Sequence, residues 1–240
     1  MTAKPAAPRP WTVLPHGPIE SLESNLWRVS GTLPGSIPLR RVMTVARLAA
    51  GGLVVHSPIA LDPAATATLD SLGAVAFIVV PNAQHRLDAS SYAVRYPAAR
   101  VLAPQGGRAK IEKLVAVHGS VGDLRDRDVV LEHVAGTRDG EALMTVRSGD
   151  RTSLVFTDTV FNMPHRTGIS GWVLKHITQS SGGPKVSRLA KLLMISDAGA
   201  FAAQLDALAA QPIARVIVSH EDIIVDDPAG ALQRIAASLR

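Results

Sequence analysis

Three short apolar runs in this chain each end beside a side chain that can bind a metal ion or move a proton. Runs of this length and hydrophobicity are typical of strands buried on both faces of a sheet. The carboxyl ends of such strands are where layered α/β proteins usually bind ligands. The three side chains are His85 after residues 75–80, Asp158 after residues 153–157 and His220 after residues 214–219. We therefore predict that they share one site.

Two histidines and one aspartate suit a single borderline ion such as Zn²⁺ or Fe²⁺, with water in the open positions. Water on such an ion becomes acidic enough to attack an ester, thioester or lactam carbonyl, or a phosphodiester. We therefore take His85, Asp158 and His220 as candidate metal ligands, and Asp158 and His85 as candidate catalytic residues. The alternative is a pocket without a metal, in which Asp158 and His220 pair directly and the protein binds a ligand or partner.

The sequence lacks the central motifs of three other catalytic classes. It contains no Gly-x-Ser-x-Gly elbow, no Gly-x-x-x-x-Gly-Lys-Ser/Thr phosphate loop and no Gly-x-Gly-x-x-Gly dinucleotide motif. A carboxylate pair of the glycosidase kind would need Asp158 with Asp88 or Asp222, and the sequence does not fix the distance between them. Metal-assisted hydrolysis or a binding site remains.

The composition indicates a globular protein in a reducing compartment. Of the 240 residues, 47% are hydrophobic and none is cysteine, which excludes a disulfide scaffold and a Cys-ligated zinc site. We predict an N-terminal arm over residues 1–20 and a single domain over residues 21–240. No apolar run approaches the ~20 residues of a membrane span, and the N-terminus has no signal-peptide core. We therefore expect a cytoplasmic protein without a membrane partner.

The formal net charge of +5 and the sequence pI of about 10.0 suggest an anionic partner. The basic residues are dispersed, however, without interleaved aromatic residues, and this argues against nucleic acid. Lys185, Arg188 and Lys191 recur at helical spacing and could attract an anion. We predict a small-molecule substrate or ligand as the partner, and the sequence does not indicate an oligomeric state.

The hydrophobic pattern predicts a meander of strands, then β–α units, a hairpin, and a last strand and helix. The expected strands are residues 25–30, 42–48, 53–56, 75–80, 100–103, 124–133 (partly loop), 141–147, 153–156 and 214–219. The expected helices are residues 62–73, 89–96, 107–117, 185–194, 197–210 and 228–239. The hairpin is linked by residues 148–151, and residues 161–183 are the least regular part of the chain.

These motifs resemble those of the metallo-β-lactamase fold superfamily from about Leu26 to the C-terminus. In that family one strand ends in Thr-His-x-His-x-Asp-His, a second ends in a metal-bridging Asp, and a late strand ends in a His before the last helix. The corresponding stretches here are VVPNAQHRLD at 79–88, VFTD at 155–158 and VIVSHED at 216–222. The form Pro-Asn-x-x-His, followed by Tyr-Pro-Ala at 96–98, looks most like an uncharacterised branch. The resemblance implies an α/β fold, a four-layer αβ/βα sandwich of two mixed sheets with helices outside.

The first motif has lost most of the family's metal ligands. Asn82 and Gln84 stand at its first two histidines, Arg86 at its aspartate and Leu87 at its next histidine. Thr137 replaces the histidine of the family's Pro-Gly-His-Thr. The aspartate and the late histidine match residue for residue, whereas the histidine of the first motif needs a one-residue slip to reach a metal position. These losses argue against a dinuclear zinc hydrolase of the ordinary type.

The resemblance also implies which residues border the substrate. Insertions at the place of residues 161–183 shape the pocket in the family, so this segment is expected to form a lid or wall. The candidate substrate-binding residues are Asn82, Arg86 and His165. His165 is alternatively a solvated loop residue. His56 stands where the family has an Asp, and it either faces the site or bonds a neighbouring backbone group.

Arg86 carries a more specific hypothesis. If this arginine points inward, it pairs with Asp158 or Asp222 and excludes a second metal ion by repulsion, since a guanidinium is a permanent cation with donors that match carboxylates. The alternative is an exposed arginine on a loop, because arginine is rarely buried.

Overall fold

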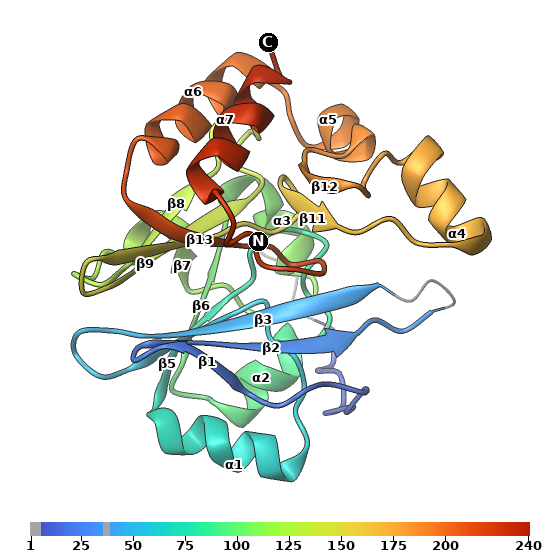
Figure 1. The fold of residues 1–240 in the computed structure, drawn as a ribbon. Helices are drawn as coiled ribbons and strands as arrows, with labels where there is room; N and C mark the ends of the chain where they lie inside the picture. Colours follow the sequence, from blue (N-terminus) through green and yellow to red (C-terminus); the bar gives the residue numbers. More distant parts are fainter. Residues whose placement is uncertain (1–5, 36–38) are drawn as a thin grey trace.

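Two β-sheets face each other in the middle of the molecule, and helices cover their outer faces (Figure 1). The structure is a computed structural model that describes residues 6–35 and 39–240. Both sheets are mixed. The predicted four-layer αβ/βα sandwich is therefore confirmed.

The first sheet contains seven strands in chain order. Its first four strands form an antiparallel meander, and the next three continue parallel to β4. The strands are β1 (Glu20–Glu23), β2 (Leu26–Thr32), β3 (Arg40–Arg47), β4 (Leu53–His56), β5 (Val75–Val79), β6 (Arg100–Ala103) and β7 (Gly119–Ser120).

The second sheet has the order β13-β10-β9-β8, with β13 parallel to β10 and the other pairs antiparallel. A further two-stranded sheet, β11 with β12, lies beside it. The strands are β8 (Val129–His133), β9 (Ala142–Ser148), β10 (Arg151–Val155), β11 (Phe161–Met163), β12 (Gly183–Lys185) and β13 (Ile213–Ile217).

Helices pack on the outer face of each sheet. The first group, which covers the first sheet, is α1 (Pro63–Leu72), α2 (Ala89–Arg95) and α3 (Arg108–Ile111), the last preceded by a 3₁₀ turn (Gln105–Gly107). A second 3₁₀ turn (Val121–Asp123) precedes β8. On the second sheet lie α6 (Ala198–Ala209) and α7 (Pro228–Ala237), whereas α4 (Gly168–Trp172), a π-helical turn (Val173–Ile177) and α5 (Arg188–Leu193) lie to one side of them (Figure 1). None of the described helices is long and apolar enough to cross a bilayer.

Strand β5 is buried on both faces, as its apolar sequence predicted. Val79 packs in the layer between the sheets, whereas Ile78 and Val80 pack against the helices of the first sheet. Strand β10 continues in the same alternation, since Val155 faces the layer between the sheets and Phe156 faces α6 and α7. These alternations place the ends of both strands at the same rim of the sandwich.

Three local expectations differ from the structure. The helix predicted over residues 107–117 stops at Ile111, because the chain is drawn into extended pairing with β6: the His118 N–H donates to the Val101 carbonyl and the Val101 N–H donates to His118 Nδ1. The hairpin link is two residues rather than four, because Ser148 and Arg151 pair and Gly149 takes the positive φ of a tight turn. Residues 161–183 contain regular structure after all, namely β11, α4 and the π-helical turn.

Candidate metal centre

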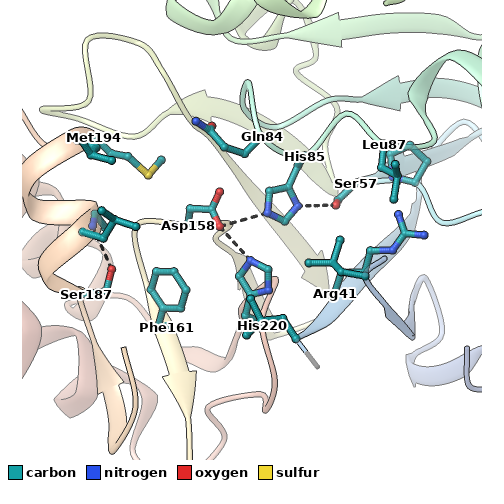
Figure 2. A pocket seen from close by; sticks show the side chains of 16 residues that line it. Arg41, Ser57, Gln84, His85, Leu87, Asp158, Phe161, Ser187, Met194 and His220 are labelled. Carbon is teal, nitrogen blue, oxygen red and sulfur yellow. Dashed lines mark hydrogen bonds and ion pairs between the residues drawn. The ribbon is translucent and has the colours of Figure 1, made fainter. Parts of the chain in front are cut away.

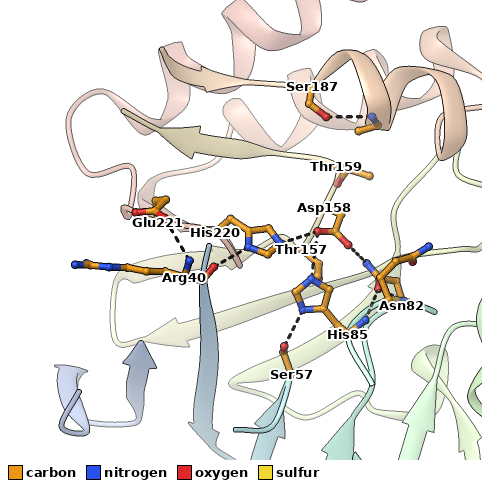
Figure 3. Close-up of polar contacts among 12 residues, drawn as sticks. Arg40, Ser57, Asn82, His85, Thr157, Asp158, Thr159, Ser187, His220 and Glu221 are labelled. Atoms are coloured by element: carbon orange, nitrogen blue, oxygen red, sulfur yellow. Dashed lines mark hydrogen bonds and ion pairs between the residues drawn. The ribbon is translucent and has the colours of Figure 1, made fainter. Parts of the chain in front are cut away.

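The loops after β5, β10 and β13 meet at one rim, and three predicted residues come together there (Figure 3). His85 Nε2 lies 3.2 Å from Asp158 Oδ1, and His220 Nε2 lies 3.1 Å from the same oxygen. The three ligand atoms all lie within 4.8 Å of one another. The convergence predicted from the strand ends is thus present, while the roles of the three residues as ligands stay predictions.

Asn82 holds Asp158 from one side. Its side chain is fully buried, and its Oδ1 accepts hydrogen bonds of 2.9 Å from the backbone N–H groups of Gln84 and His85. These two donors fix the orientation of the amide, so that Nδ2 faces Asp158 and donates to Oδ2 over 2.7 Å. One carboxylate oxygen is therefore capped by an amide, and the other is left to the two histidines.

Glu141 binds the turn formed by residues 157–159, which we call the Asp158 turn. Its side chain is fully buried, and its Oε1 accepts from the Thr157 N–H at 3.0 Å and from the Thr159 hydroxyl at 2.7 Å. Its Oε2 accepts from the Asp158 N–H at 3.0 Å. Burial, and then the charge of Asp158, raise the pKa of Glu141 to about 7.

Each imidazole is oriented through its other ring nitrogen. His220 Nδ1 donates to the Arg40 carbonyl at 2.7 Å, and the His220 ring stacks on Phe161 at 5.7 Å between ring centroids. His85 Nδ1 lies 3.0 Å from the Ser57 hydroxyl. A backbone carbonyl or hydroxyl at the far nitrogen is the usual support of a metal-binding histidine, since it fixes the ring and its tautomer.

The interactions between Asp158 and the two histidines stabilise the ionised form of the aspartate. Burial alone would raise the pKa of Asp158, but His85 and His220 outweigh it and hold that pKa well below its usual range. Burial alone would lower the pKa of His220, and the hydrogen bond and charge of Asp158 outweigh it and raise that pKa.

This donor set fits one divalent ion. With Nδ1 of His220 donating to a carbonyl, Nε2 carries the lone pair in the neutral ring and faces a carboxylate oxygen, an arrangement that needs a proton or a cation between the two acceptors. Two ligands at ~2.1 Å from a tetrahedral ion lie ~3.4 Å apart, close to the separations of the two histidines from Asp158. His85 Nε2, His220 Nε2 and Asp158 Oδ1 would hold such an ion.

The three residues lie on the floor of a pocket of about 320 Å³ (Figure 2). Its walls are mostly apolar, formed by Leu33, Leu39, Pro58, Leu87, Phe161, Leu189, Leu193 and Met194. Arg41 also lines the pocket, but its Nη2 lies 2.7 Å from Asp88 Oδ2 in a nearly buried ion pair. The pocket therefore offers a large apolar surface beside a small polar floor.

Arg86 does not take the predicted inward position. Its Nη1 donates to the Lys110 carbonyl at 2.6 Å, and it lies outside the pocket lining. The hypothesis that it pairs with Asp158 or Asp222 is wrong, because the Asn82-centred turn directs His85 inward and the next side chain outward.

Neither of the other two predicted residues, Asn82 and His165, lines the pocket. Asn82 touches Asp158, as described, and His165 Nδ1 lies 3.0 Å from the Ser181 hydroxyl. Substrate binding by these two residues, and by Arg86, stays a prediction.

His56 fits neither of its two expectations. It is fully buried in β4, and neither ring nitrogen has a hydrogen-bond partner among the described residues. Burial, with a contribution from the nearby His85, lowers the pKa of His56 to about 3. Its cross-strand neighbour Thr44 also has an unbonded hydroxyl, as does Thr157 at the end of β10. The layer between the sheets therefore holds unsatisfied polar groups near its rim.

Three supporting residues escaped the sequence analysis. Glu141 precedes an apolar strand, where a charged residue is usually exposed. Arg41, the second residue of β3, pairs with Asp88, which lies 47 residues further along the chain. Ser57 adopts a φ of 55° between His56 and Pro58. The His-Ser-Pro break directly after a strand was the available signal, since a bend there redirects the next side chains.

Comparisons with known proteins agree with this architecture. Residues 27–107, about a third of the chain, match a domain of unknown function (DUF4336). A search of curated proteins gave no match. The metallo-β-lactamase FIM-1 from Pseudomonas aeruginosa, solved in its mono-zinc form, is 10% identical with a TM-score of 0.59 over 94% of this chain and 96% of that one.

A metallo-β-lactamase from Pontibacter korlensis is similar to the same extent. It is 8% identical, with a TM-score of 0.58 over 91% of this chain and 98% of its own. Identities this low speak for the fold alone. The chain thus has the metallo-β-lactamase fold, in a divergent form whose first motif reads Pro-Asn-x-x-His.

Proposed function

We propose that this protein is a metal-dependent hydrolase that uses one divalent ion, zinc or iron. The observation that carries the proposal is the position of His85, Asp158 and His220, whose ligand atoms converge on the floor of an apolar pocket. FIM-1, which has the same fold, was solved in a mono-zinc form, so a protein of this fold can hold a single ion. A second ion is disfavoured because the Asn82 amide already donates to the Asp158 oxygen that the two histidines leave open.

The chain's own residues hold and orient the site. Asp158 serves as a ligand rather than a general base, because its pKa is held well below its usual range and a base works best near the ambient pH. Arg40 and Ser57 fix the two imidazoles, and Glu141 fixes the backbone of the aspartate turn. An ion held there would supply Lewis-acid chemistry, which acidifies water and polarises a carbonyl.

The pocket favours a substrate whose group beside the scissile bond is apolar. Its walls are aliphatic and aromatic. Among the described lining residues, Arg41 is the only arginine or lysine, and its charge is neutralised by Asp88. A phosphodiester would arrive with a charge that no unpaired guanidinium or ammonium in this lining meets. Esters, thioesters and lactams with an apolar acyl part fit better.

We also propose, on composition alone, that the protein works in the cytoplasm and has no nucleic-acid partner. The first part rests on the absence of cysteine and the second on the dispersed basic residues. Neither bears on the chemistry of the site.

The test is hydrolysis of 4-nitrophenyl acetate, butyrate and octanoate by protein supplied with Zn²⁺ or Fe²⁺. We expect kcat/KM to rise at least about tenfold from acetate to octanoate, because each added methylene buries apolar surface in the pocket. His220→Ala should lose at least about a hundredfold, whereas His176→Ala, at an exposed histidine outside the pocket lining, should retain activity. Equal activity of His220→Ala and the parent would place the reaction elsewhere, and a metal-bound protein inert to every ester would favour a ligand-binding role.

A further inference from the structure

One corner of the molecule exposes an unusual amount of apolar side chain. Of the nine large hydrophobic residues that are exposed among the described residues, six lie between 169 and 193. These six, which we call the apolar corner, are Ile169, Trp172, Ile177, Leu189, Leu192 and Leu193. Ile169 is 86% exposed and Leu192 is 78% exposed. A cluster of this kind marks an interaction surface.

The helices that carry the apolar corner project from one side of the molecule (Figure 1). The N–H of Arg188, at the start of α5, donates to the Thr178 carbonyl just after the π-helical turn, so the two pieces are joined. Within α5, Leu189, Leu192 and Leu193 follow helical spacing and lie on one face, which is the exposed one, while Ala190 is buried. A surface helix normally shows the opposite arrangement.

The same segment is basic and has no acidic residue. Residues 159–196 contain five Lys or Arg and no Asp or Glu. Arg166 pairs with Glu221, but Lys175 and Arg188 form no ion pair with any described residue. Lys185 and Lys191 donate to the backbone carbonyls of Ser181 and Ser238, which leaves their charge uncompensated.

We propose that the apolar corner docks on an anionic lipid bilayer. Exposed leucine, isoleucine and tryptophan beside lysine and arginine is the composition of helices that lie in the membrane interface, where the apolar side chains enter the acyl boundary and the cations meet lipid headgroups. The indole of Trp172 suits the headgroup level. This docking requires no membrane-spanning segment, and it replaces the expectation of a protein without a membrane partner.

A second copy of the chain fits this surface less well. In a symmetric dimer the same patch meets itself, so the uncompensated cations of residues 159–196 would face each other without a carboxylate between them. An anionic bilayer supplies the opposite charge and a fluid apolar phase into which a protruding surface can insert.

Docking would also place the pocket at the membrane. Leu189 and Leu193 belong both to the apolar corner and to the pocket lining, so the two surfaces are continuous. An apolar molecule dissolved in the bilayer could then enter the pocket without crossing water. This consequence rests on the proposed function, whereas the docking itself does not.

The docking is tested by cosedimentation of the full chain with vesicles of phosphatidylcholine alone or with roughly a third phosphatidylglycerol, without measuring hydrolysis. We expect at least about tenfold stronger partition onto the anionic vesicles at low salt, and a marked loss at about 0.5 M NaCl, because salt screens the headgroup charge. Equal binding to both vesicle types, or none to either, would overturn the proposal.

Variants locate the surface. Trp172→Glu, Leu192→Glu and Arg188→Glu should each reduce binding several-fold, and none of the three residues lines the pocket. The matched controls are Val94→Glu, exposed on α2, which covers the first sheet, and Arg125→Glu, an exposed residue bridged to Val130 near the start of β8. Both should bind as the parent does. Thermal unfolding checks that each variant is folded. Corner variants that bind like the controls, or a dimer that these variants dissociate while vesicle binding is absent, would contradict membrane docking.

Discussion

The Asp158 carboxylate depends on partners far from it in sequence. Asn82 donates to one of its oxygens, and Glu141 binds the backbone N–H of the same residue. Both partners are fully buried, so neither can exchange its hydrogen bonds for water. The geometry of the metal centre therefore rests on these two side chains as much as on the candidate ligands.

Replacing Glu141 by Gln should destabilise the fold by about 2–3 kcal/mol. The amide can keep one accepting oxygen, but it turns an NH₂ group toward a backbone N–H that needs an acceptor, and a buried unmatched donor costs about that much. Urea unfolding measures the change. Glu112→Gln is the control, because Glu112 forms a partly exposed i,i+4 pair with Arg108 and its loss should cost less than about 1 kcal/mol. Equal urea midpoints for the two variants would show that Glu141 does not stabilise the Asp158 turn.

The pKa of His56 gives the stability a pH dependence of defined sign. Because burial lowers the folded-state pKa from 6.5 to about 3, His56 is neutral in both states at pH 8 and contributes no dependence there. Below pH 6.5 the unfolded chain takes up a proton that the folded chain refuses, so stability falls as the pH drops from 6.5 toward 3. At pH 5 this loss amounts to about 2 kcal/mol.

A His56→Leu variant isolates this effect. The two side chains are similar in size, and the histidine makes no hydrogen bond within the described part of the chain. The variant should therefore be no less stable than the parent at pH 8 and about 2 kcal/mol more stable at pH 5. Urea unfolding at both pH values gives the comparison. A parent and variant with the same pH dependence would mean that His56 can be protonated in the folded state.

Site residues could be predicted from the sequence where a local hydrophobic pattern precedes them. Asp158 and His220 follow apolar runs directly, and His85 lies five residues after one, so the sequence pattern marks all three. Glu141 and Arg41 act through contacts that close only in the folded chain, and nothing in their immediate sequence distinguishes them from surface charges.

At the scale of the elements, hydrogen bonds join the loop between β8 and β9 to the start of α6, and we call this connection the latch. The Gly136 carbonyl accepts from the N–H groups of Ser196 at 2.7 Å and Asp197 at 3.1 Å. Gly136 itself has a φ of 73°, and a Cβ there would lie 2.1 Å from the Asp197 carbonyl oxygen. This latch fixes the loop that leads into Glu141, and through it the Asp158 turn.

Gly136→Ala should therefore cost more than about 2 kcal/mol, since it adds a backbone clash to a left-handed conformation. Gly149→Ala is the matched control, because Gly149 has a φ of 64° with no atom within 4 Å of the added Cβ, and only the conformational cost of about 1 kcal/mol applies. Thermal unfolding of the two variants measures the difference. Equal losses of stability in the two variants would mean that the backbone around Gly136 can shift to accept the added Cβ.

Helices were predictable where the hydrophobic periodicity and the capping residues indicate the same boundaries. The helix α1 begins after Asp62, whose side chain accepts from the Ala65 N–H, and it ends before Gly73, as these residues indicated. The helix expected over residues 107–117 was cut short by pairing of His118 with Val101, a long-range contact that outweighs the local preference. Residues 161–183 gave no clear period, because their helices expose rather than bury their apolar side chains.

In the whole molecule, the sandwich supplies rigidity and its rim supplies chemistry. Each sheet is buried on both faces by apolar layers, so the strand ends that carry His85, Asp158 and His220 are held by the two cores. The order of elements along the chain and the αβ/βα layering followed from the sequence pattern and its resemblance to the metallo-β-lactamase fold. The apolar pocket and the apolar corner did not, since both arise from side chains that different loops bring to one rim.

The central claim is a single divalent ion held by His85, Asp158 and His220, and metal content tests it most directly. Protein purified without a metal-affinity tag, incubated with Zn²⁺ or Fe²⁺ and freed of excess ion, should contain about one ion per chain by mass spectrometry of the metal. Asp158→Ala should retain almost none, and His165→Ala should match the parent. A parent without bound ion, or an Asp158→Ala variant with the same content as the parent, would contradict the account.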